Sequence, residues 1–377
     1  MEREMKRSSS AAIAMLLSTT GLASADVPNV VTDIAPVHGL VSRVMAGVGE
    51  PSLLVRPGSS PHGYSMRPSE ARALDQANLV FWVGHELTPW LEGPIEELGG
   101  DAHVIELLEA KGTVHHDFRT GATFEAHDHG DHDEHGHEDH EEHAHDDHGH
   151  DDHDDHAHDD HGHDDHDDHA HDDHGHDDHD DHAHEEHGRD DHEEHAHDDH
   201  GQDDHDHDGL DPHAWLAPEN GKAWLSAIAE ELSELDPENA ATYAANAAAG
   251  QAEIDAVVAS LRPDLALVAE TPFVVFHDAY QYFEHSFDLA AAGAISLGDA
   301  ARPSAARLAE IHETVRELGV VCVFSEPQYN QSLVHSVAEA GDIKELVMDP
   351  LGFEIALGAA FYPNLLQDLG ASLAACK

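Results

Sequence analysis

Residues 238–261 read ENAATYAANAAAGQAEIDAVVASL, a stretch rich in Ala that contains one Gly and no Pro. Ala has the highest helix propensity, so this composition predicts one long helix. A second helical pattern, at residues 218–235, stops just before Asp236 and Pro237, where Asp can cap a helix and Pro can begin the next one. We therefore expect a helix, assigned to residues 237–265, that links the parts of the chain on either side.

Short apolar runs alternate with helical patterns on both sides of that helix. Strands are expected at residues 29–34, 52–55, 79–83 and 104–107 before it, and at 273–276, 290–296, 320–324 and 343–348 after it. The other helices are expected at residues 37–46, 68–76, 87–98, 279–285, 303–318, 331–340 and 361–375. Repeated strand–helix units predict parallel sheets with helices on their faces, so the fold class is α/β with two βα lobes. The N-terminal lobe is assigned to residues 26–126 and 209–236, and the C-terminal lobe to residues 266–377.

The first 25 residues have the composition of a secretory signal peptide. Arg3, Lys6 and Arg7 precede an apolar run at residues 11–22, and a series of small residues ends at Ala25. The apolar run is shorter than the roughly 20 residues that a membrane-spanning helix needs. We therefore expect export, cleavage near Ala25, and a soluble mature protein in the periplasm.

Residues 127–208 form an insert rich in His and acidic residues. They hold 30 of the 41 His residues of the chain, and 38 acidic residues against one Arg, so they carry more than half of the net charge of −62. From His143 a 13-residue unit, HAHDDHGHDDHDD, runs through five copies, of which the last two are degraded. The insert has no large apolar side chain to bury and is expected to be disordered without metal. Its imidazole density favours weak, multi-site Zn²⁺ binding over a plain acidic spacer, and its charge excludes nucleic acid as a partner.

The chain contains two Cys residues, Cys322 and Cys376. An even number of Cys residues in an exported protein suggests one disulfide. The alternative is a pair of free buried thiols. A bond would tether the last helix to a strand and would contribute about 4 kcal/mol of stability by loop entropy.

Four candidate metal ligands follow strands or lie in loops at the edges of the predicted sheets. His62 lies in a loop rich in Gly and Pro after the second strand, and His213 in the first ordered stretch after the insert. His277 follows the fifth strand and Asp349 the eighth, whereas Glu326 is interpreted as holding a loop or a helix end. Open parallel sheets bind ligands beyond the carboxyl ends of their strands, so both lobes would offer these residues to a shared cleft. Three imidazoles and one carboxylate form a tetrahedral set that suits Zn²⁺.

Five short motifs give the sequence a resemblance to a known family. They are PHGYSMRP at residues 61–68, PHAWL at 212–216, VFHDAY at 275–280, FSEPQ at 324–328 and MDPLG at 348–352. On these motifs the whole mature chain resembles the cluster A-I metal-binding proteins of bacterial zinc and manganese ABC importers, most closely their periplasmic zinc-uptake branch. The resemblance implies a rigid interdomain helix and a disulfide between Cys322 and Cys376.

The resemblance also implies a set of metal ligands. His62, His213 and His277 would bind the ion, with Asp349 or water as the fourth ligand. In the manganese branch the third ligand is typically Glu, so the His at position 277 favours zinc. Some zinc-binding members have a Glu directly before the first His, but this chain has Pro61 there. The identity of the fourth ligand therefore stays open.

These features predict a transport protein, not an enzyme. We expect a monomer that captures Zn²⁺ with high affinity in the periplasm and hands it to the membrane permease of an ABC importer. One alternative is a zinc buffer or storage protein in which the insert does the binding. Another is a hydrolase that activates water on a three-His zinc, but the sequence shows neither a general base nor a substrate pocket. Cu²⁺ and Ni²⁺ also bind imidazole well, and the sequence does not discriminate against them.

Overall fold

The computed structural model describes residues 27–119, 124, 209–296, 303–341 and 343–377. The expected signal peptide, residues 1–25, and the His-rich insert, residues 127–208, lie outside these described residues. The described residues all belong to one compact unit. No helix in the described ranges is both long and apolar enough to cross a membrane.

The N-terminal part forms a four-stranded parallel sheet in the order β2-β1-β3-β4. Its strands are β1 (Val30–Thr32), β2 (Ser52–Leu53), β3 (Leu79–Trp82) and β4 (His103–Glu106). Its helices are α1 (Ala35–Val44), α2 (Pro68–Asp75) and α3 (Pro89–Leu98), each with Pro in its first turn. The buried strands β1 and β3 carry almost only apolar side chains, as expected for strands covered on both faces.

The C-terminal part repeats the same arrangement in the order β6-β5-β7-β8, again with parallel pairing. Its strands are β5 (Phe273–His277), β6 (Gly293–Ser296), β7 (Cys322–Ser325) and β8 (Lys344–Val347). Its helices are α6 (Gln281–Phe287), α7 (Ala305–Glu317), α8 (Ser332–Gly341) and α9 (Phe361–Ala374). In each sheet the strand order reverses beside the first strand of that sheet, and such a point is where α/β folds bind ligands.

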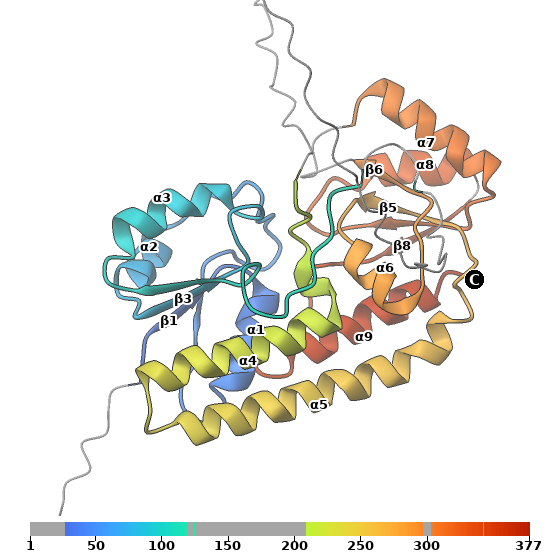
Figure 1. Ribbon diagram of the computed structural model, residues 1–377. Coiled ribbons are helices and arrows are strands. Elements are labelled where there is room, and N and C mark those ends of the chain that lie inside the picture. Colours follow the sequence, from blue (N-terminus) through green and yellow to red (C-terminus); the bar gives the residue numbers. More distant parts are fainter. Residues whose placement is uncertain (1–26, 120–123, 125–208, 297–302, 342) are drawn as a thin grey trace, which may run out of the picture. The chain divides into compact units, whose positions relative to one another are not determined.

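Helices α4 (Pro218–Leu235) and α5 (Ala240–Leu265) follow one another along the chain and pack together. Helix α5 also contacts α1 of the N-terminal part and α9 of the C-terminal part, and it runs past both sheets in Figure 1. A Cβ atom on Gly250 would lie 2.9 Å from Leu225 of α4, so Gly allows the close approach of these two helices. The largest hydrophobic core draws on both sheets and on α4, α5 and α9. The expected α/β architecture of two βα lobes with a long connecting helix is therefore confirmed.

The start of α5 differs from the prediction. Asp236 and Pro237 do not begin the helix, because Asp236 ends α4 and its Oδ2 accepts hydrogen bonds from Asn239 Nδ2 at 2.7 Å and from Tyr243 OH at 2.8 Å. Asn239 is the residue before the first turn of α5. At its other end the helix runs to Leu265, the end of the assigned range, and it includes Pro263. A Pro there removes only one backbone hydrogen bond of the last turn, while Leu265 is buried in the core.

The two Cys residues form a disulfide. Cys322 begins β7 and Cys376 follows α9, with their Cα atoms 5.8 Å apart. Both residues are buried. The predicted bond is confirmed, and the alternative of two free thiols is wrong.

Candidate metal centre

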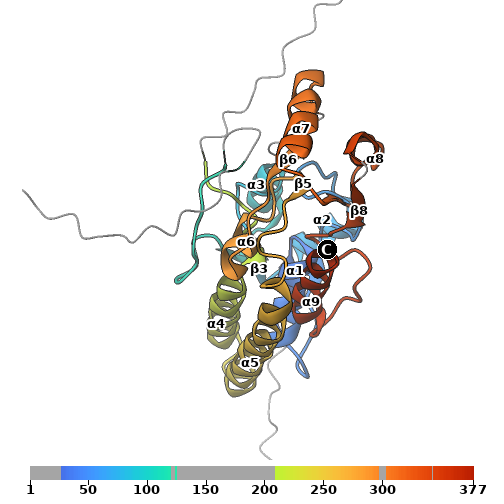
Figure 2. The ribbon, with the colours of Figure 1, turned by 90° about the vertical axis from the view of Figure 1, so that its right-hand side faces the viewer.

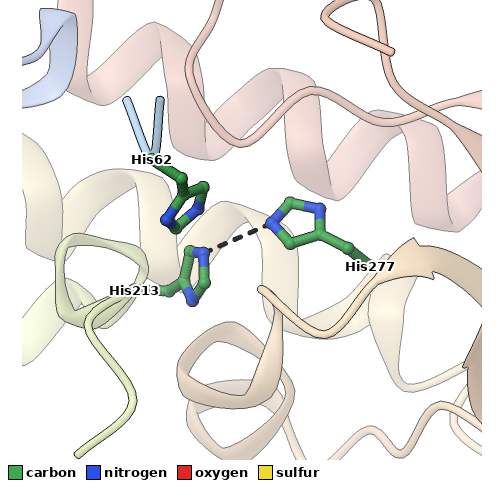
Figure 3. Close-up of side chains that lie close together, drawn as sticks. All are labelled: His62, His213 and His277. Atoms are coloured by element: carbon green, nitrogen blue, oxygen red, sulfur yellow. Dashed lines mark hydrogen bonds between the residues drawn. The ribbon is translucent and has the colours of Figure 1, made fainter. Parts of the chain in front are cut away.

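Three of the predicted ligands come together in the structure. One nitrogen from each of His62, His213 and His277 lies within 4.8 Å of the other two, and Figure 3 shows the three rings facing a common point. His213 and His277 are buried, and His62 is half-buried. They come from three distant places in the sequence, namely the β2–α2 loop, the residue before the short helix η1 (Ala214–Leu216), and the end of β5.

His277 is held by a carboxylate from the neighbouring strand. It is the last residue of β5, and β5 pairs with β7 in the same sheet. Glu326 directly follows β7, so parallel pairing brings it beside His277. His277 Nδ1 lies 2.7 Å from Glu326 Oε1, and both side chains are buried. Glu326 was predicted to hold a loop or a helix end, but the contact that its side chain makes here is with the imidazole of His277, whose orientation it fixes.

His213 has a carboxylate partner two residues earlier in the chain. Asp211 Oδ1 accepts a hydrogen bond from the backbone N–H of His213 at 2.9 Å and lies 2.7 Å from its Nδ1. The intervening Pro212 fixes this turn of the backbone. Burial raises the pKa of the Asp211 carboxyl to about 7, against the opposing effects of the His213 N–H and of the Arg119 charge. The indole of Trp215 donates to Pro350 O at 2.8 Å, which anchors the segment just after His213.

These two contacts determine which ring nitrogens face the centre of the site. An ionised carboxylate only accepts hydrogen bonds, so the Nδ1 atoms of His213 and His277 carry the protons and the Nε2 atoms carry lone pairs. The two Nε2 atoms lie 3.3 Å apart. In a tetrahedral zinc site, Zn–N bonds of about 2.0–2.1 Å place neighbouring nitrogens about 3.3–3.4 Å apart. The pair therefore has the spacing of two ligands of one zinc ion, and each His has the carboxylate partner that metal-binding His residues usually have.

His62 completes the group from the loop between β2 and α2. Its ring centroid lies 5.5 Å from that of His213 and 6.0 Å from that of His277. Two contacts hold its loop in place: Trp90 Nε1 donates to Pro61 O at 2.7 Å, and the hydroxyl oxygens of Ser60 and Tyr329 lie 3.1 Å apart.

The cavity between the three rings is small. Its volume is about 10 Å³, and Trp215, Tyr329 and Leu351 line it together with the imidazoles. A cavity of about 10–15 Å³ holds one water molecule, so this space suits a single ion and not an organic substrate. Its largely apolar walls strengthen the attraction between an ion and its ligands.

Asp349 follows β8 as predicted but does not belong to the group of three imidazoles. Its Oδ1 accepts from Gln328 Nε2 at 2.7 Å and from Leu351 N at 2.9 Å, and its Oδ2 accepts from Phe353 N at 2.6 Å. The carboxylate thus holds the loop after β8. Its role as a metal ligand stays a prediction.

Replacing Glu326 with Gln should lower zinc affinity about tenfold, at the low end of the effect of such outer-sphere partners. A neutral amide is a weaker acceptor for the Nδ1–H of His277 and leaves that imidazole a poorer ligand. Competition with a chromophoric zinc chelator would measure the change. Glu231→Gln is the matched control, because Glu231 Oε2 lies 3.1 Å from the exposed His103 far from the site. Equal zinc affinity of the two variants would contradict the role of Glu326.

Comparison with known proteins agrees with this site. The family model for the periplasmic zinc-uptake complex component A (ZnuA) matches residues 30–376. The high-affinity zinc uptake system protein ZnuA of Paracoccus denitrificans is 44% identical over 374 residues, covering 99% of each chain. The protein of the same description from Brucella abortus is 42% identical over 347 residues, covering 92% of this chain and 91% of the relative.

The likeness extends to the fold. A crystal structure of ZnuA superposes with a TM-score of 0.61 at 18% identity, covering 92% of this chain and 99% of that one. The family model spans nearly all of the described residues, including the positions of the three His residues of the site. The chain therefore belongs to the family of the periplasmic zinc-uptake complex component A.

Proposed function

We propose that this protein captures Zn²⁺ in the periplasm and delivers it to the membrane permease of an ABC zinc importer. The observation that carries the proposal is the pair of Nε2 atoms of His213 and His277, which face each other 3.3 Å apart with His62 beside them. Two lone pairs at this distance repel each other unless a cation or a proton lies between them. The names of the relatives, high-affinity zinc uptake system proteins, support zinc as that cation.

Membership of the zinc-uptake family also supports export of the protein and delivery of zinc to an importer. A periplasmic uptake component needs a route out of the cytoplasm, and we assign this role to residues 1–25, with cleavage near Ala25. Its partner in the membrane is the permease of the importer. We propose that the protein acts on this partner as a monomer, and the three His residues of the site, which come from one chain, support this.

Within the site, we propose His62, His213 and His277 as the protein ligands and water as the fourth. Asp349 would have to leave three hydrogen-bond donors to reach the ion, whereas the cavity between the rings has the size of one water molecule. A zinc-bound water could also support hydrolysis. The small volume of the cavity favours transport over that activity.

Deleting residues 127–208 tests the proposal against the alternative of a zinc buffer. The intact protein should show one tight binding event and several weaker ones in a Zn²⁺ titration, because the insert offers many imidazoles but no large apolar side chain that would fix them in one arrangement. Only the weaker events should disappear in the deletion variant. Cells that carry the deletion should take up zinc almost normally in replete medium and poorly when zinc is scarce. Loss of the tight event would show that the insert does the binding.

Zinc affinity should fall as the pH falls from 8 to 5. Zinc needs neutral imidazoles, and free imidazole titrates near pH 6.5, so protons compete with the ion. Asp211 adds to this effect, because its carboxyl, with a pKa of about 7, becomes neutral and no longer supports His213 as a ligand. Measurements of affinity with pH-buffered chelators would detect the change, and a constant affinity over this range would contradict imidazole ligation.

The stability of the metal-free protein should change with pH in the opposite direction, because of the carboxyl group of Asp211. The folded pKa of Asp211 is raised above its ordinary value of 3.8, so the stability that it contributes is greatest below pH 4 and is lost as the pH rises through 7. The difference in melting temperature between zinc-loaded and metal-free protein should therefore grow from pH 5 to pH 8.

A further inference from the structure

The chain segments that flank the insert pair with each other before they reach the metal site. Asp117 and Leu210 form an antiparallel bridge, Phe118 N donates to Gly209 O at 3.0 Å, and Asp211 N donates to His116 O at 2.8 Å. The two segments run side by side in both ribbon views (Figures 1 and 2). The residues that lead into His213 are thus fixed by the segment that precedes the insert.

Arg119, in that preceding segment, is a buried cation with two buried carboxylate partners. Its side chain is 10% exposed, against 3% for Asp278 and 0% for Glu284. Arg119 Nε lies 3.0 and 3.1 Å from the two oxygens of Asp278, and Nη1 and Nη2 lie 2.7 and 3.1 Å from those of Glu284. The ring of Phe124 covers the guanidinium, with its centroid 3.8 Å from Cζ. Such a planar fork, holding two carboxylates at once, is a geometry that Lys cannot reproduce.

Both partners of Arg119 lie within seven residues after His277 in the chain. Asp278 directly follows His277 at the end of β5, and Glu284 lies in α6, the helix that follows. Tyr282 of α6 joins the same two segments, because its hydroxyl accepts from His116 N at 3.0 Å and donates to Asp211 O at 2.8 Å. One guanidinium thus ties the segment that carries His213 to the strand end that carries His277.

We propose that Arg119 is a positioning residue of the metal site, which holds His213 and His277 at the spacing that zinc requires. The inference rests on the proposed zinc-binding function. Without the guanidinium, Asp278 and Glu284 are left as buried charges with no counterion, a state that favours local rearrangement. The segment before His213 then loses the contacts of Arg119 with Asp278 and Glu284 and keeps the Tyr282 hydroxyl as its bond to α6. The separation of the two Nε2 atoms is therefore less tightly fixed.

The test compares Arg119→Met and Arg119→Lys with Arg43→Met in the full-length mature protein. Arg43 is the matched control, because its guanidinium also makes two 2.9 Å bonds to one carboxylate, Glu253, but joins α1 to α5 away from the site. A competing chelator strong enough to strip the insert would measure the affinity of the tight site. A chelator chase would measure zinc release, and the visible spectrum of bound Co²⁺ would report the ligand geometry.

Arg119→Met should bind zinc about tenfold more weakly, through faster release and with an altered Co²⁺ spectrum, within the range seen for outer-sphere partners. Arg119→Lys should show a smaller loss, and Arg43→Met none. The inference is wrong if Arg119→Met has wild-type affinity, or if Arg43→Met weakens binding as much. If Arg119→Met does not fold, Arg119→Lys decides, and wild-type affinity and spectrum in that variant overturn the inference. His277→Ala separates the two proposals: if it too leaves the tight event intact, the zinc site itself is wrong.

Discussion

His277→Ala is expected to lower the affinity of the tight site for zinc by more than about a hundredfold, beyond the range for outer-sphere partners. The substitution removes one of three imidazoles that the fold brings within 4.8 Å of one another. It also leaves the buried carboxylate of Glu326 without the Nδ1–H that it accepts at 2.7 Å. The remaining imidazoles, His62 and His213, come from different segments and would hold an ion with two ligands only.

The measurement should be made with the insert present and with residues 127–208 removed, because the insert offers many other imidazoles. His85→Ala is the matched control. His85 also follows a strand, β3, but its side chain is 56% exposed and its Nδ1 pairs with Glu92 at 3.1 Å. Wild-type affinity is expected for the control in both backgrounds. Wild-type affinity of His277→Ala without the insert would contradict the assignment of the site.

The architecture was predictable because strong local signals agree with one another. Helix α4 has the predicted bounds, since Pro218 fits its first turn and Asp236 and Pro237 interrupt the pattern. The start of α5 was wrong for a tertiary reason. Asp236 stands at the end of α4, and its carboxylate accepts from the hydroxyl of Tyr243 inside α5, so Asp236 and Pro237 form the connection between the two helices. Short-range preference alone does not decide between these two roles.

The site was predictable only in part. His62, His213 and His277 stood out because each lies in an edge loop or at a strand end, and the structure brings them together. That they bind the ion stays a prediction. The partner of His277 could not be identified, because Glu326 comes next to it only if β5 and β7 are neighbours, and the sequence does not state the strand order. The contact between Asp211 and His213 could have been predicted from the sequence, since a carboxylate two residues before a His can accept a hydrogen bond from its ring.

The contacts of Arg119 were even harder to predict from the sequence than those of Glu326. It lies 159 residues before Asp278 in the chain, and the whole insert separates them. No periodicity or motif connects two residues at that distance. Only the folded structure shows that the guanidinium closes a link between the segments that carry two of the imidazoles.

Removing the disulfide is expected to destabilise the protein by about 4 kcal/mol. The bond closes a loop with a sequence separation of 54 residues. Its loss increases the conformational entropy of the unfolded chain and so favours unfolding. A domain of this size loses about 2–4 °C of melting temperature per kcal/mol, so the expected drop is about 8–16 °C. The effect can be measured by calorimetry on the metal-free protein, oxidised and chemically reduced, and on the double variant Cys322→Ala, Cys376→Ala.

His277→Ala should act mainly on zinc affinity and removal of the disulfide mainly on the melting temperature. Each variant is therefore a control for the other. Cys322 lies at the start of β7 and Cys376 after α9, where the bond anchors a helix that packs against α5. His277 and Glu326 lie at the opposite, carboxyl ends of β5 and β7. Reduction should therefore lower the melting temperature and leave zinc affinity at 25 °C nearly unchanged, whereas His277→Ala should lower zinc affinity strongly and the melting temperature less than reduction does. If the reduced protein melts at the same temperature as the oxidised one, the bond contributes no stability. If reduction also abolishes tight zinc binding below the melting temperature, the two ends of the sheet are coupled, and the site depends on the anchoring of α9.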